Sequence, residues 1–384
     1  MPYFSKPIPL SLYVHLPWCI QKCPYCDFNS HAIKRETLPE EDYTNALLAE
    51  LDHHLRVIDQ RSLLSIFFGG GTPSLFSPNM IAKLLDGIAQ RFNFSPSMEI
   101  TLEANPGTVE QKRFKDYHDC GINRLSLGIQ SFQDEQLNIL GRVHNSNEAK
   151  NAIHIAQRYF DRINLDLMYG LPHQSIENAC HDLEIALSFH PTHLSWYQLT
   201  IEPNTVFYKK TPPLPQDEMI DGMETIGRAY LAKNNFRQYE VSAYAKNEAI
   251  CQHNRHYWEF GDYLGIGAGA HSKLTYPDEQ KIIRFAQIKQ PYDYLQSHKQ
   301  RTISQHQQIL SQQDLIFEFM LNALRLTEGV PLTLFHERTG LSLDIIRDRI
   351  TLAQEKGLLL EEDRQLITSM RGKKYLNELI QIFM

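Results

Sequence analysis

The stretch Leu12–His31, LYVHLPWCIQKCPYCDFNSH, constrains the fold more than any other part of this chain. An extended apolar run, Leu12–Leu16, leads directly into three of the six cysteines. These are Cys19, Cys23 and Cys26, and their spacing is C-x3-C-x2-C. The sequence therefore predicts a buried strand followed by a short loop that carries three thiolates.

Three thiolates on one short loop can bind a cluster of soft metal ions. A structural zinc site uses four protein ligands, and between Cys19 and Phe28 there is neither a fourth cysteine nor a histidine. A four-iron cluster held by three cysteines keeps one iron open to a substrate or cofactor. We expect such an iron–sulfur site, with a zinc loop or three buried thiols as the alternatives.

Strand-like and helix-like segments alternate over the first two-thirds of the chain. The predicted strands are Leu12–Leu16, Leu63–Phe68, Met98–Leu102, Arg124–Ile129, Ile163–Met168 and His193–Leu199. The predicted helices are Glu40–Ile58, Pro78–Arg91, Val109–Cys120, Asp134–Leu140, Asn147–Phe160, Ser175–Ser188 and Asp217–Asn234. Six strand–helix units with apolar strands predict a parallel sheet, and right-handed crossovers would curl it into a partial barrel. The expected fold class is α/β, a partial six-unit (βα) barrel with a small, mainly helical C-terminal domain.

The last third of the chain follows a different pattern. Strand-like segments Arg237–Tyr244 and Tyr263–Ala270 flank the stretch HNRHYW, and residues 275–305, rich in Gln, Lys and His, predict a connector. Further helices are expected at Ser311–Leu324, Leu332–Thr339, Ser342–Lys356 and Gly372–Phe383, with a hairpin at Leu358–Thr368. We expect a barrel over residues 1–240, a strand extension and connector over 241–305, and a winged-helix-like domain over 306–384.

Composition and charge narrow the class of protein. The chain has 384 residues, 42% apolar residues and a net charge of −7, which is typical of a globular protein that does not bind nucleic acid. From position 307 onward, nine Lys and Arg stand against eleven Asp and Glu, so the last domain is expected to be structural or partner-binding. The sequence has no apolar run long enough to span a bilayer and no signal-peptide pattern. Because the cysteine triplet needs reduced thiols, we expect a cytoplasmic protein.

Glycines and polar residues follow the predicted strands. Gly69, Gly70 and Gly71 come directly after the second strand, where the lack of a Cβ lets the backbone approach a ligand. The polar residues at successive strand ends are Glu103, Gln130, Arg142 and Asp166. Together they can accept hydrogen bonds from hydroxyl groups and offer a cation to a carboxylate, whereas each alone is more often a cap or a solvated loop residue.

The cysteine spacing, with Tyr25 before the third cysteine, resembles the signature of the radical S-adenosylmethionine (SAM) superfamily. In that family three cysteines bind a [4Fe–4S] cluster and SAM chelates the fourth iron. The motifs GGGTPS, EANP, GIQSF, LGR, DLMYGLP and GIGAGAHS extend the resemblance, over nearly the whole chain, to the HemN/HemW branch. The resemblance implies that Cys19, Cys23 and Cys26 bind the cluster. It also implies three groups of SAM-binding residues. Contacts to the cluster-bound SAM are matched by Tyr13, Gly70, Glu103 and His271, and positions that hold a second SAM in the oxidase members are matched by Gly71, Thr72, Gln130, Arg142, Asp166 and Thr200. Tyr25 completes the SAM-binding set.

Two departures separate the chain from the oxidases of that branch. The oxidases carry a further cysteine two positions after the third, where this chain has Phe28, and they have a longer region than the 18 residues that precede Cys19 here. Both departures favour the HemW members, which act as haem chaperones. The stretch His253–Trp258 resembles the H-N-x-x-Y-W motif associated with haem in that family, which implies haem contacts from His253, Asn254, Tyr257 and Trp258.

A histidine with aromatic neighbours can offer an imidazole to iron and ring faces to a porphyrin. From the residues alone, His256 and Cys251 remain rival iron ligands, and His253 could instead cap a turn beside core aromatics. The resemblance implies a haem chaperone that binds a [4Fe–4S] cluster, SAM and haem. The alternative is an oxygen-independent coproporphyrinogen III oxidase, for which the catalytic residues stay unassigned. Implied partners are a haem-acceptor protein, with respiratory-chain or membrane-associated proteins as candidates, and an electron donor or iron–sulfur assembly protein.

Overall fold

A mixed sheet of twelve strands forms the framework of the described residues, which are 2–4, 7–33, 38–55, 61–300 and 305–384 of the computed structural model. Six of its strands are parallel and pair in chain order: β1 (Leu10–Leu16), β4 (Leu63–Gly70), β5 (Glu99–Ala104), β6 (Arg124–Gln130), β7 (Arg162–Tyr169) and β8 (His193–Gln198). The α/β class and the six-unit partial barrel predicted from the sequence are confirmed.

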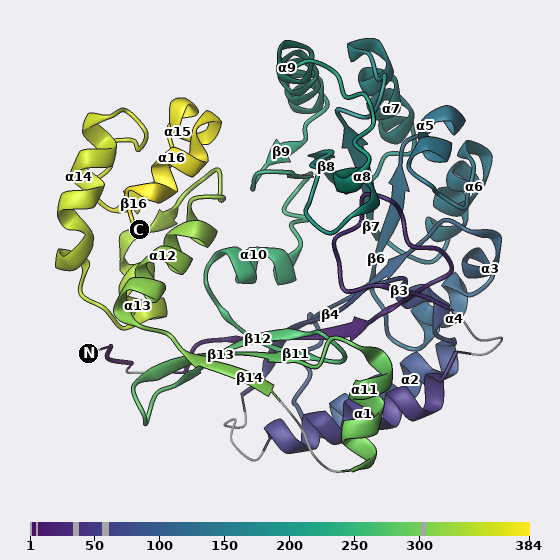
Figure 1. The fold of residues 1–384 in the computed structure, drawn as a ribbon, viewed down its shortest axis with the longest axis horizontal. Coiled ribbons are helices and arrows are strands. Elements are labelled where there is room, and N and C mark those ends of the chain that lie inside the picture. The colour runs from purple at the N-terminus through teal and green to yellow at the C-terminus, as the bar shows by residue number, and fades with distance from the viewer. Residues whose placement is uncertain (1, 5–6, 34–37, 56–60, 301–304) are drawn as a thin grey trace.

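Helices cover the outer side of this curved sheet (Figure 1). They are α1 (Glu40–His54), α2 (Pro78–Ala89), α3 (Thr108–Gln111), α4 (Phe114–Asp119), α5 (Asp134–Ile139), α6 (Ser146–Ala156), α7 (Ile176–Ser188) and α9 (Asp217–Lys233). Side chains alternate along each strand, so Leu125 and Leu127 of β6 are fully buried in the hydrophobic core while Ser126 lines the inside of the barrel. The inner face therefore carries polar side chains at the cavity, and it is the face that can hold a ligand.

The sheet continues past β1 into a second half that sequence reasoning missed in part. β11 (Asp262–Ile266) pairs parallel with β1, and β12 (His271–Tyr276), β13 (Lys281–Gln287) and β14 (Gln305–Ile309) follow antiparallel. The connector predicted over residues 275–305 is wrong, because it holds β13 and the helix α11 (Pro291–Lys299), while residues 301–304 lie outside the described residues. β13 is ordered because Phe285 packs in the core of the barrel and Ile282 packs in the core of the C-terminal domain.

Three predicted elements are shorter or divided. The predicted helix Val109–Cys120 is divided into α3 and α4. Arg113 lies between the two helices, and its guanidinium donates hydrogen bonds to the Ser74 and Leu75 carbonyls. The predicted strand Arg237–Tyr244 is two short antiparallel strands, β9 (Arg237–Gln238) and β10 (Ala243–Ala245). The predicted strand Tyr263–Ala270 ends at Ile266, because Gly267 turns the chain with a φ of +105°. Positions 56–58 of the first predicted helix lie outside the described residues.

The C-terminal domain has a hydrophobic core of its own. It contains α12 (Gln312–Ala323), α13 (Leu332–Thr339), the 3₁₀ turn η2 (Leu343–Ile346), α14 (Arg347–Glu355), α15 (Met370–Lys374) and α16 (Leu376–Gln381). β15 (Val330–Pro331) pairs with β16 (Gln365–Leu366), and a single bridge joins Leu359 to Thr368 in place of the longer hairpin that we predicted. The mainly helical character predicted for this domain is confirmed.

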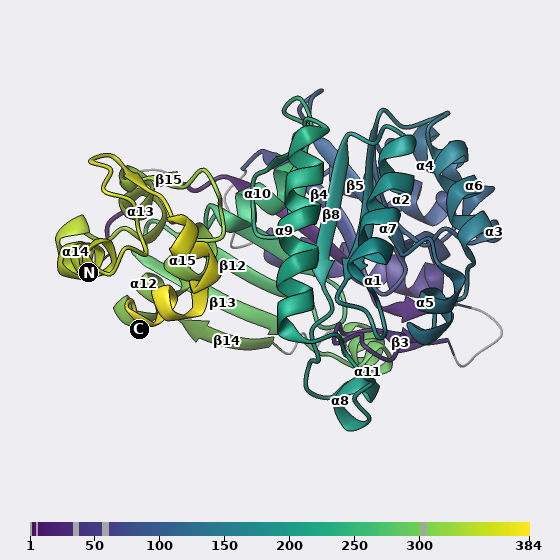
Figure 2. The same ribbon diagram turned by 90° about the horizontal axis from the view of Figure 1, so that it is seen from above.

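A short strand pair and a short helix lie at opposite ends of the barrel. β2 (Trp18–Cys19) pairs with β3 (His31–Ala32) in the loop that follows the carboxyl end of β1. The helix α10 (Gln252–Trp258) instead packs on β4, near the amino ends of the strands. Figure 2 shows α10 on one side of the sheet, and β3 with the short helix α8 (Val206–Lys209) on the other.

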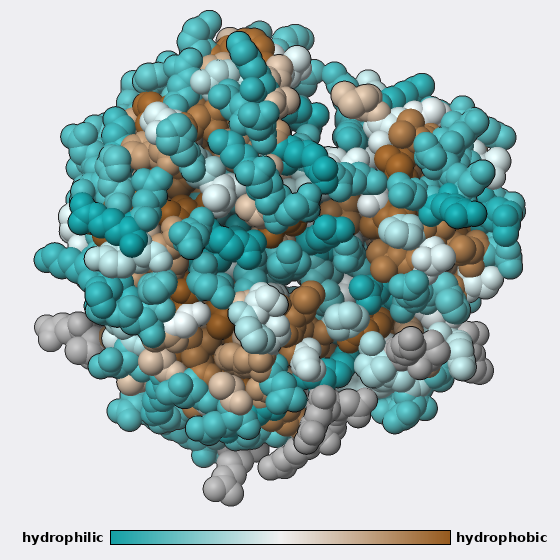
Figure 3. Space-filling view, turned by 180° about the vertical axis from the view of Figure 1, so that it is seen from behind, coloured by the Kyte–Doolittle hydropathy of each residue, from teal (hydrophilic) through white to brown (hydrophobic). Residues whose placement is uncertain are grey.

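The surface seen from behind, on the α10 side, is mostly hydrophilic, with hydrophobic residues showing in patches between the polar ones (Figure 3). Among the helices of the described residues, none combines the length and the apolar character needed to cross a membrane.

Candidate cofactor-binding site

A cavity of about 270 Å³ lies at the carboxyl ends of the parallel strands, beneath the cysteine loop. Sites of parallel α/β folds form at this edge because the loops after successive strands meet there. Most of the residues singled out from the sequence line this one cavity: Cys19, Cys23, Tyr25, Cys26, Gly70, Gly71, Thr72, Glu103, Gln130, Arg142 and Asp166. The fold thus brings together residues that are far apart in the chain, from Cys19 to Asp166.

The cysteine loop is held by backbone hydrogen bonds. His31 N donates to Pro17 O at 2.7 Å, and Ile33 N donates to Cys19 O at 2.9 Å. Cys19 is 8% exposed, and burial raises the pKa of its thiol. Within the described ranges, no group of three His, Cys, Asp or Glu side chains is arranged to hold a single metal ion. Three cysteines that line one cavity are a ligand set that a multi-iron cluster can use.

The glycine turn forms one wall of the cavity. Gly70 has a φ of +118°, and a Cβ at this position would lie 2.6 Å from Cε1 of His15. A Cβ at Gly71 would lie 2.5 Å from the Trp18 carbonyl oxygen. Gly70 thus packs on the His15 ring of β1 and Gly71 on the backbone of the cysteine loop, and neither position has room for a Cβ unless its neighbours shift.

Two carboxyl groups, those of Glu103 and Asp166, line the cavity. Glu103 Oε2 accepts a hydrogen bond from Gly70 N at 3.3 Å. Burial, and secondarily the nearby Asp166 carboxylate, raises the pKa of Glu103 to about 8. Burial also raises the pKa of Asp166, although Ser126 and Asn164 donate hydrogen bonds of 2.9 and 2.8 Å to it. A ligand that brings a cation or hydroxyl donors would therefore be favoured in this cavity.

Arg142 supplies a positive charge in the same cavity. Its guanidinium donates to Asn105 Oδ1 at 2.6 Å, to Gly128 O at 2.8 Å and to Cys23 Sγ at 3.6 Å. Its Nε is buried and has no hydrogen-bond partner in the part of the chain that the structure describes. Asn105 in turn donates to Thr72 Oγ1 at 3.0 Å. Arg142 thus brings a positive charge into the cysteine cavity, where a guanidinium can pair with an anionic group of a ligand.

Other lining residues were not singled out from the sequence. They include Asn105, Ser126 and Tyr197, and the Tyr197 hydroxyl donates to Gln130 Oε1 at 2.8 Å. Ser126 could have been found from the period-two pattern of β6, where polar residues alternate with leucines. Asn105 follows β5 directly, so the strand-end argument that selected Glu103 applies to it as well.

Three predicted SAM-binding residues do not line the cavity. Thr200 is exposed beyond the end of β8, and His271 is exposed at the start of β12. Tyr13 lies one layer deeper inside the barrel, where its hydroxyl contacts His15 Nδ1 at 3.0 Å. His15 Nε2 in turn contacts the Asn29 carbonyl at 2.9 Å. Since a carbonyl only accepts, His15 is protonated on Nε2, and the Tyr13 hydroxyl donates to Nδ1.

The HNRHYW stretch forms α10, and its side chains point into different surroundings. His253 is half-buried, and its Nδ1 contacts Ser65 Oγ at 3.0 Å while its ring lies 5.0 Å from that of Phe67. Cys251 is 0% exposed against Glu99, and His256 is 3% exposed with Nε2 donating to Asp262 O. Tyr257 and Trp258 are half-buried and contact each other edge to face, and Asn254 is half-buried as well. The motif lies at the amino end of the barrel, away from the cysteine cavity, and His253 does not cap a turn.

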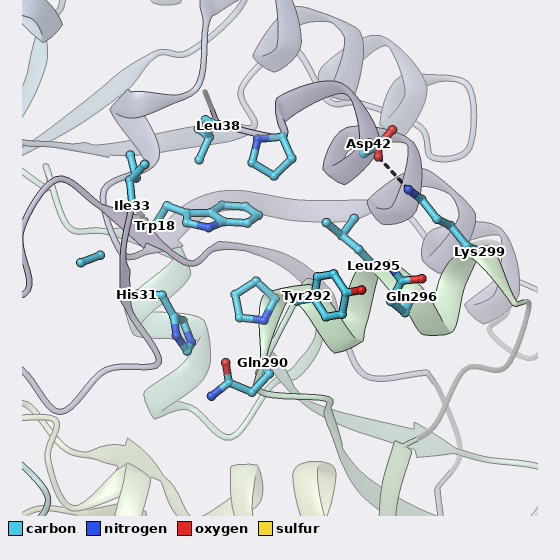
Figure 4. A pocket seen from close by; sticks show the side chains of 13 residues that line it. Trp18, His31, Ile33, Leu38, Asp42, Gln290, Tyr292, Leu295, Gln296 and Lys299 are labelled. Atoms are coloured by element: carbon cyan, nitrogen blue, oxygen red, sulfur yellow. Dashed lines mark hydrogen bonds and ion pairs between the residues drawn. The ribbon is translucent and has the colours of Figure 1, made fainter. Parts of the chain in front are cut away.

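A second cavity, of about 300 Å³, lies on the other side of the cysteine loop, between α1 and α11 (Figure 4). Trp18, Ile33, Leu38, Tyr292 and Leu295 give it an apolar lining. The ion pair of Asp42 and Lys299, 2.9 Å long, spans its edge. Nothing in the sequence had singled out this cavity.

Comparisons with known protein families agree with this geometry. Residues 13–185 match the Radical SAM superfamily, and residues 310–373 match the HemN C-terminal domain. The fold resembles the solved structure of coproporphyrinogen III oxidase (HemN) from Escherichia coli, with a TM-score of 0.82 over 98% of this chain and 90% of that one. At 22% sequence identity, that likeness bears on the fold alone. The molecule is therefore a radical SAM protein with a HemN-like architecture.

The relatives narrow the class further. The chain is 48% identical to "Heme chaperone HemW" of Haemophilus influenzae and 47% identical to that of Escherichia coli, in each case over 98% of both chains. It is also 34% identical to a bovine mitochondrial "Radical S-adenosyl methionine domain-containing protein 1", over 96% of this chain and 86% of that one. The chain belongs to the HemW family of radical SAM proteins.

Proposed function

We propose that this protein is a haem chaperone, which binds haem and passes it to an acceptor protein. The observation that supports this proposal is the near full-length similarity to proteins named heme chaperone HemW. In the proposal, Cys19, Cys23 and Cys26 bind a [4Fe–4S] cluster, and SAM completes the coordination of the open iron. The fold likeness to HemN keeps coproporphyrinogen III oxidation as the second candidate.

The SAM-binding role rests on chemistry that the cavity offers. Gly70 and Gly71 let the backbone approach, Glu103 and Asp166 can accept hydrogen bonds from an amino group or a ribose, and Arg142 can pair with a carboxylate. We propose that Tyr25, Thr72 and Gln130 complete this site from the same cavity. Tyr13, Thr200 and His271 would join it only through a rearrangement, because they do not line the cavity.

For haem, we propose His253 as an iron ligand, with Asn254, Tyr257 and Trp258 beside the porphyrin. The Ser65 hydroxyl donates to Ser11 Oγ at 2.9 Å, so the contact of Ser65 with His253 uses the Nδ1 proton of the imidazole. Nε2 is then the nitrogen with a lone pair, and a hydrogen bond at the other nitrogen is the arrangement that orients histidine ligands. Burial lowers the pKa of His253 to about 3, so the ring is neutral at physiological pH.

The two rival residues, Cys251 and His256, are less suited to bind the haem iron. Cys251 is completely buried, and burial raises the pKa of its thiol to about 12, which disfavours the thiolate that iron requires. His256 is buried with its Nε2 committed to the Asp262 carbonyl. His253 is the more accessible of the two histidines in this helix.

The test compares haem titrations of wild type, His253→Ala and a matched control, His154→Ala, under anaerobic conditions. His154 is an exposed helical histidine that also packs on a phenylalanine ring, Phe189, at 4.9 Å. We expect His253→Ala to shift the Soret band and weaken haem retention while its iron–sulfur content stays at the wild-type level, and His154→Ala to behave as wild type. A titration of His253→Ala that matches wild type would show that another residue binds the iron.

A parallel incubation separates the two candidate functions. Reconstituted protein with SAM, reductant and coproporphyrinogen III should give no protoporphyrinogen IX, because Phe28 stands where the oxidases have a further cysteine. Turnover in that incubation would replace the chaperone proposal with the oxidase.

A further inference from the structure

Asn29 ties the cysteine loop to a distant part of the chain. It stands three positions after Cys26, and its Nδ2 donates to two backbone carbonyls, Ala268 O and Lys289 O, each at 2.8 Å. Its Oδ1 contacts His31 Nε2 at 3.2 Å, and its own carbonyl accepts the hydrogen bond from His15 Nε2 at 2.9 Å. Since Nδ2 donates to carbonyls, the amide orientation is fixed and Oδ1 is the acceptor.

The turn that accepts the hydrogen bond to Ala268 O is itself held by hydrogen bonds. It is the turn of residues 267–270 between β11 and β12, where Gly267 N donates to the fully buried Glu50 at 2.9 Å. Ala268 N donates to the Tyr43 hydroxyl at 2.7 Å, and that hydroxyl donates to His15 O at 2.9 Å. A Cβ at Gly269 would lie 2.3 Å from Asn29 Nδ2, so the turn fits closely around the amide.

The other carbonyl comes from the start of the α11 region. Figure 4 shows this seam from the side of the second cavity, with His31 of the cysteine loop facing Gln290, the neighbour of Lys289. Asn29 therefore sits between two segments that follow β11 and β13, both belonging to the second half of the sheet. Both N–H groups of its amide donate to backbone carbonyls, so its donors are committed to contacts within the protein.

We propose that Asn29 is a positioning residue, which holds the cysteine loop on the 267–270 turn and thereby fixes Cys26 relative to Cys19. The proposal rests on the cluster assigned to the three cysteines under the proposed function. Cys19 is fixed separately by the pairing of β2 with β3, whereas Cys26 lies between the backbone bond to Cys23 O and Asn29. Without the Asn29 side chain, the segment after Cys26 would lose its hydrogen bonds to the second half of the sheet, while β2 with β3 and the strands of the barrel stayed paired.

The experiment uses the full-length, reconstituted protein and three variants. Asn29→Ala removes all side-chain contacts, and Asn29→Asp keeps the size but turns both donors into acceptors that face carbonyl oxygens. The matched control is Asn123→Ala, because Asn123 also bridges two backbone groups, Met98 O at 2.7 Å and Ile100 N at 2.8 Å, at the amino end of the barrel. Readouts are the rate of cluster loss to an iron chelator, the EPR spectrum of the reduced cluster with and without SAM, and the Tm of the apo protein.

We expect Asn29→Ala and Asn29→Asp to lose the cluster on the order of tenfold faster than wild type, since both variants lose the two hydrogen bonds to Ala268 O and Lys289 O. Their EPR spectra should broaden with altered response to SAM, while Asn123→Ala lowers Tm but keeps wild-type cluster loss. Wild-type rates and spectra in both Asn29 variants would overturn the proposal, as would equal cluster loss in Asn123→Ala. If wild type itself assembled no cluster, the proposed function would fail instead, which keeps the two failures distinguishable.

Discussion

Replacing Arg142 should lower the reduction potential of the bound cluster. The guanidinium reaches Cys23 Sγ at 3.6 Å and is held by Asn105 and Gly128, so its charge stays beside one of the three proposed cluster ligands. Reduction adds negative charge to the cluster, and a nearby cation stabilises that charge. Arg142→Met keeps most of the volume and removes both the charge and the N–H···S contact.

The magnitude follows from the distance. Two unit charges about 4 Å apart interact by roughly 4 kcal/mol at an effective dielectric constant of 20. The added electron spreads over the whole cluster, so about half of that energy, roughly 2 kcal/mol, applies. At about 2.3 kcal/mol per 100 mV for one charge, the potential of Arg142→Met should fall by about 90 mV.

The assay is a redox titration of reconstituted protein, followed by EPR, on wild type and three variants. Arg142→Lys keeps the positive charge but lacks the planar guanidinium with its several N–H donors, so it should give an intermediate potential. Lys22→Met is the control, because Lys22 is a neighbour of Cys23 in the chain but exposed, with Nζ donating to Phe28 O. A potential of Arg142→Met equal to that of wild type and Lys22→Met would refute the reasoning, provided that the apo proteins melt alike.

Three further predictions concern the cysteines, the glycine turn and the buried carboxyl group. The triple variant Cys19→Ser, Cys23→Ser, Cys26→Ser should lose the visible iron–sulfur absorption and keep the circular dichroism of the fold; unchanged iron and sulfide content would contradict the cluster site. Gly70→Ala should destabilise the apo protein by about 2 kcal/mol in urea unfolding, because φ is +118° and the new Cβ meets His15. The control Gly357→Ala has a φ of +67° but nothing within 4 Å, so it should cost less, and equal losses would argue against the steric account. Because the folded-state pKa of Glu103 is raised from 4.5 to about 8, the folded apo protein holds a proton that the unfolded chain releases. The stability from this group is therefore fully present below about pH 4.5 and is lost as pH rises through about 8. Glu103→Gln should remove that part of the pH dependence, and an unchanged slope in urea unfolding at several pH values would contradict it.

The strand-end argument brought most of the candidate residues to one cavity because it depends only on topology. Cys19, Glu103 and Asp166 are far apart in the sequence, but parallel strands bring their carboxyl ends to one edge. The same argument could not place Tyr13, because the side chain lies earlier on β1 and faces the inside one layer deeper. Thr200 follows its strand by two residues and turns to solvent.

The second half of the sheet was harder to predict. β13 and β14 carry Gln, Lys, Arg and His between their apolar residues, so composition suggested a linker. β13 forms an antiparallel hairpin with the neighbouring β12, and β14 adds to β13, so these strands are ordered by pairing at the edge of the sheet and not by an apolar pattern of their own. The position of α10 could not be predicted from local sequence either, because the contact between His253 and Ser65 joins residues 188 positions apart.

The hydrogen bond between Asn29 and Lys289 also has a consequence during synthesis of the chain. The cysteine loop leaves the ribosome early, but its partners in the 267–270 turn and at Lys289 are about 240 to 260 residues behind it. At about 5–20 residues per second, translation takes roughly 12–50 s to deliver them. During that interval the three thiols belong to an unfinished loop. Cluster insertion is therefore expected to be a late, post-translational step, and nascent chains stalled before residue 267 should acquire no stable cluster.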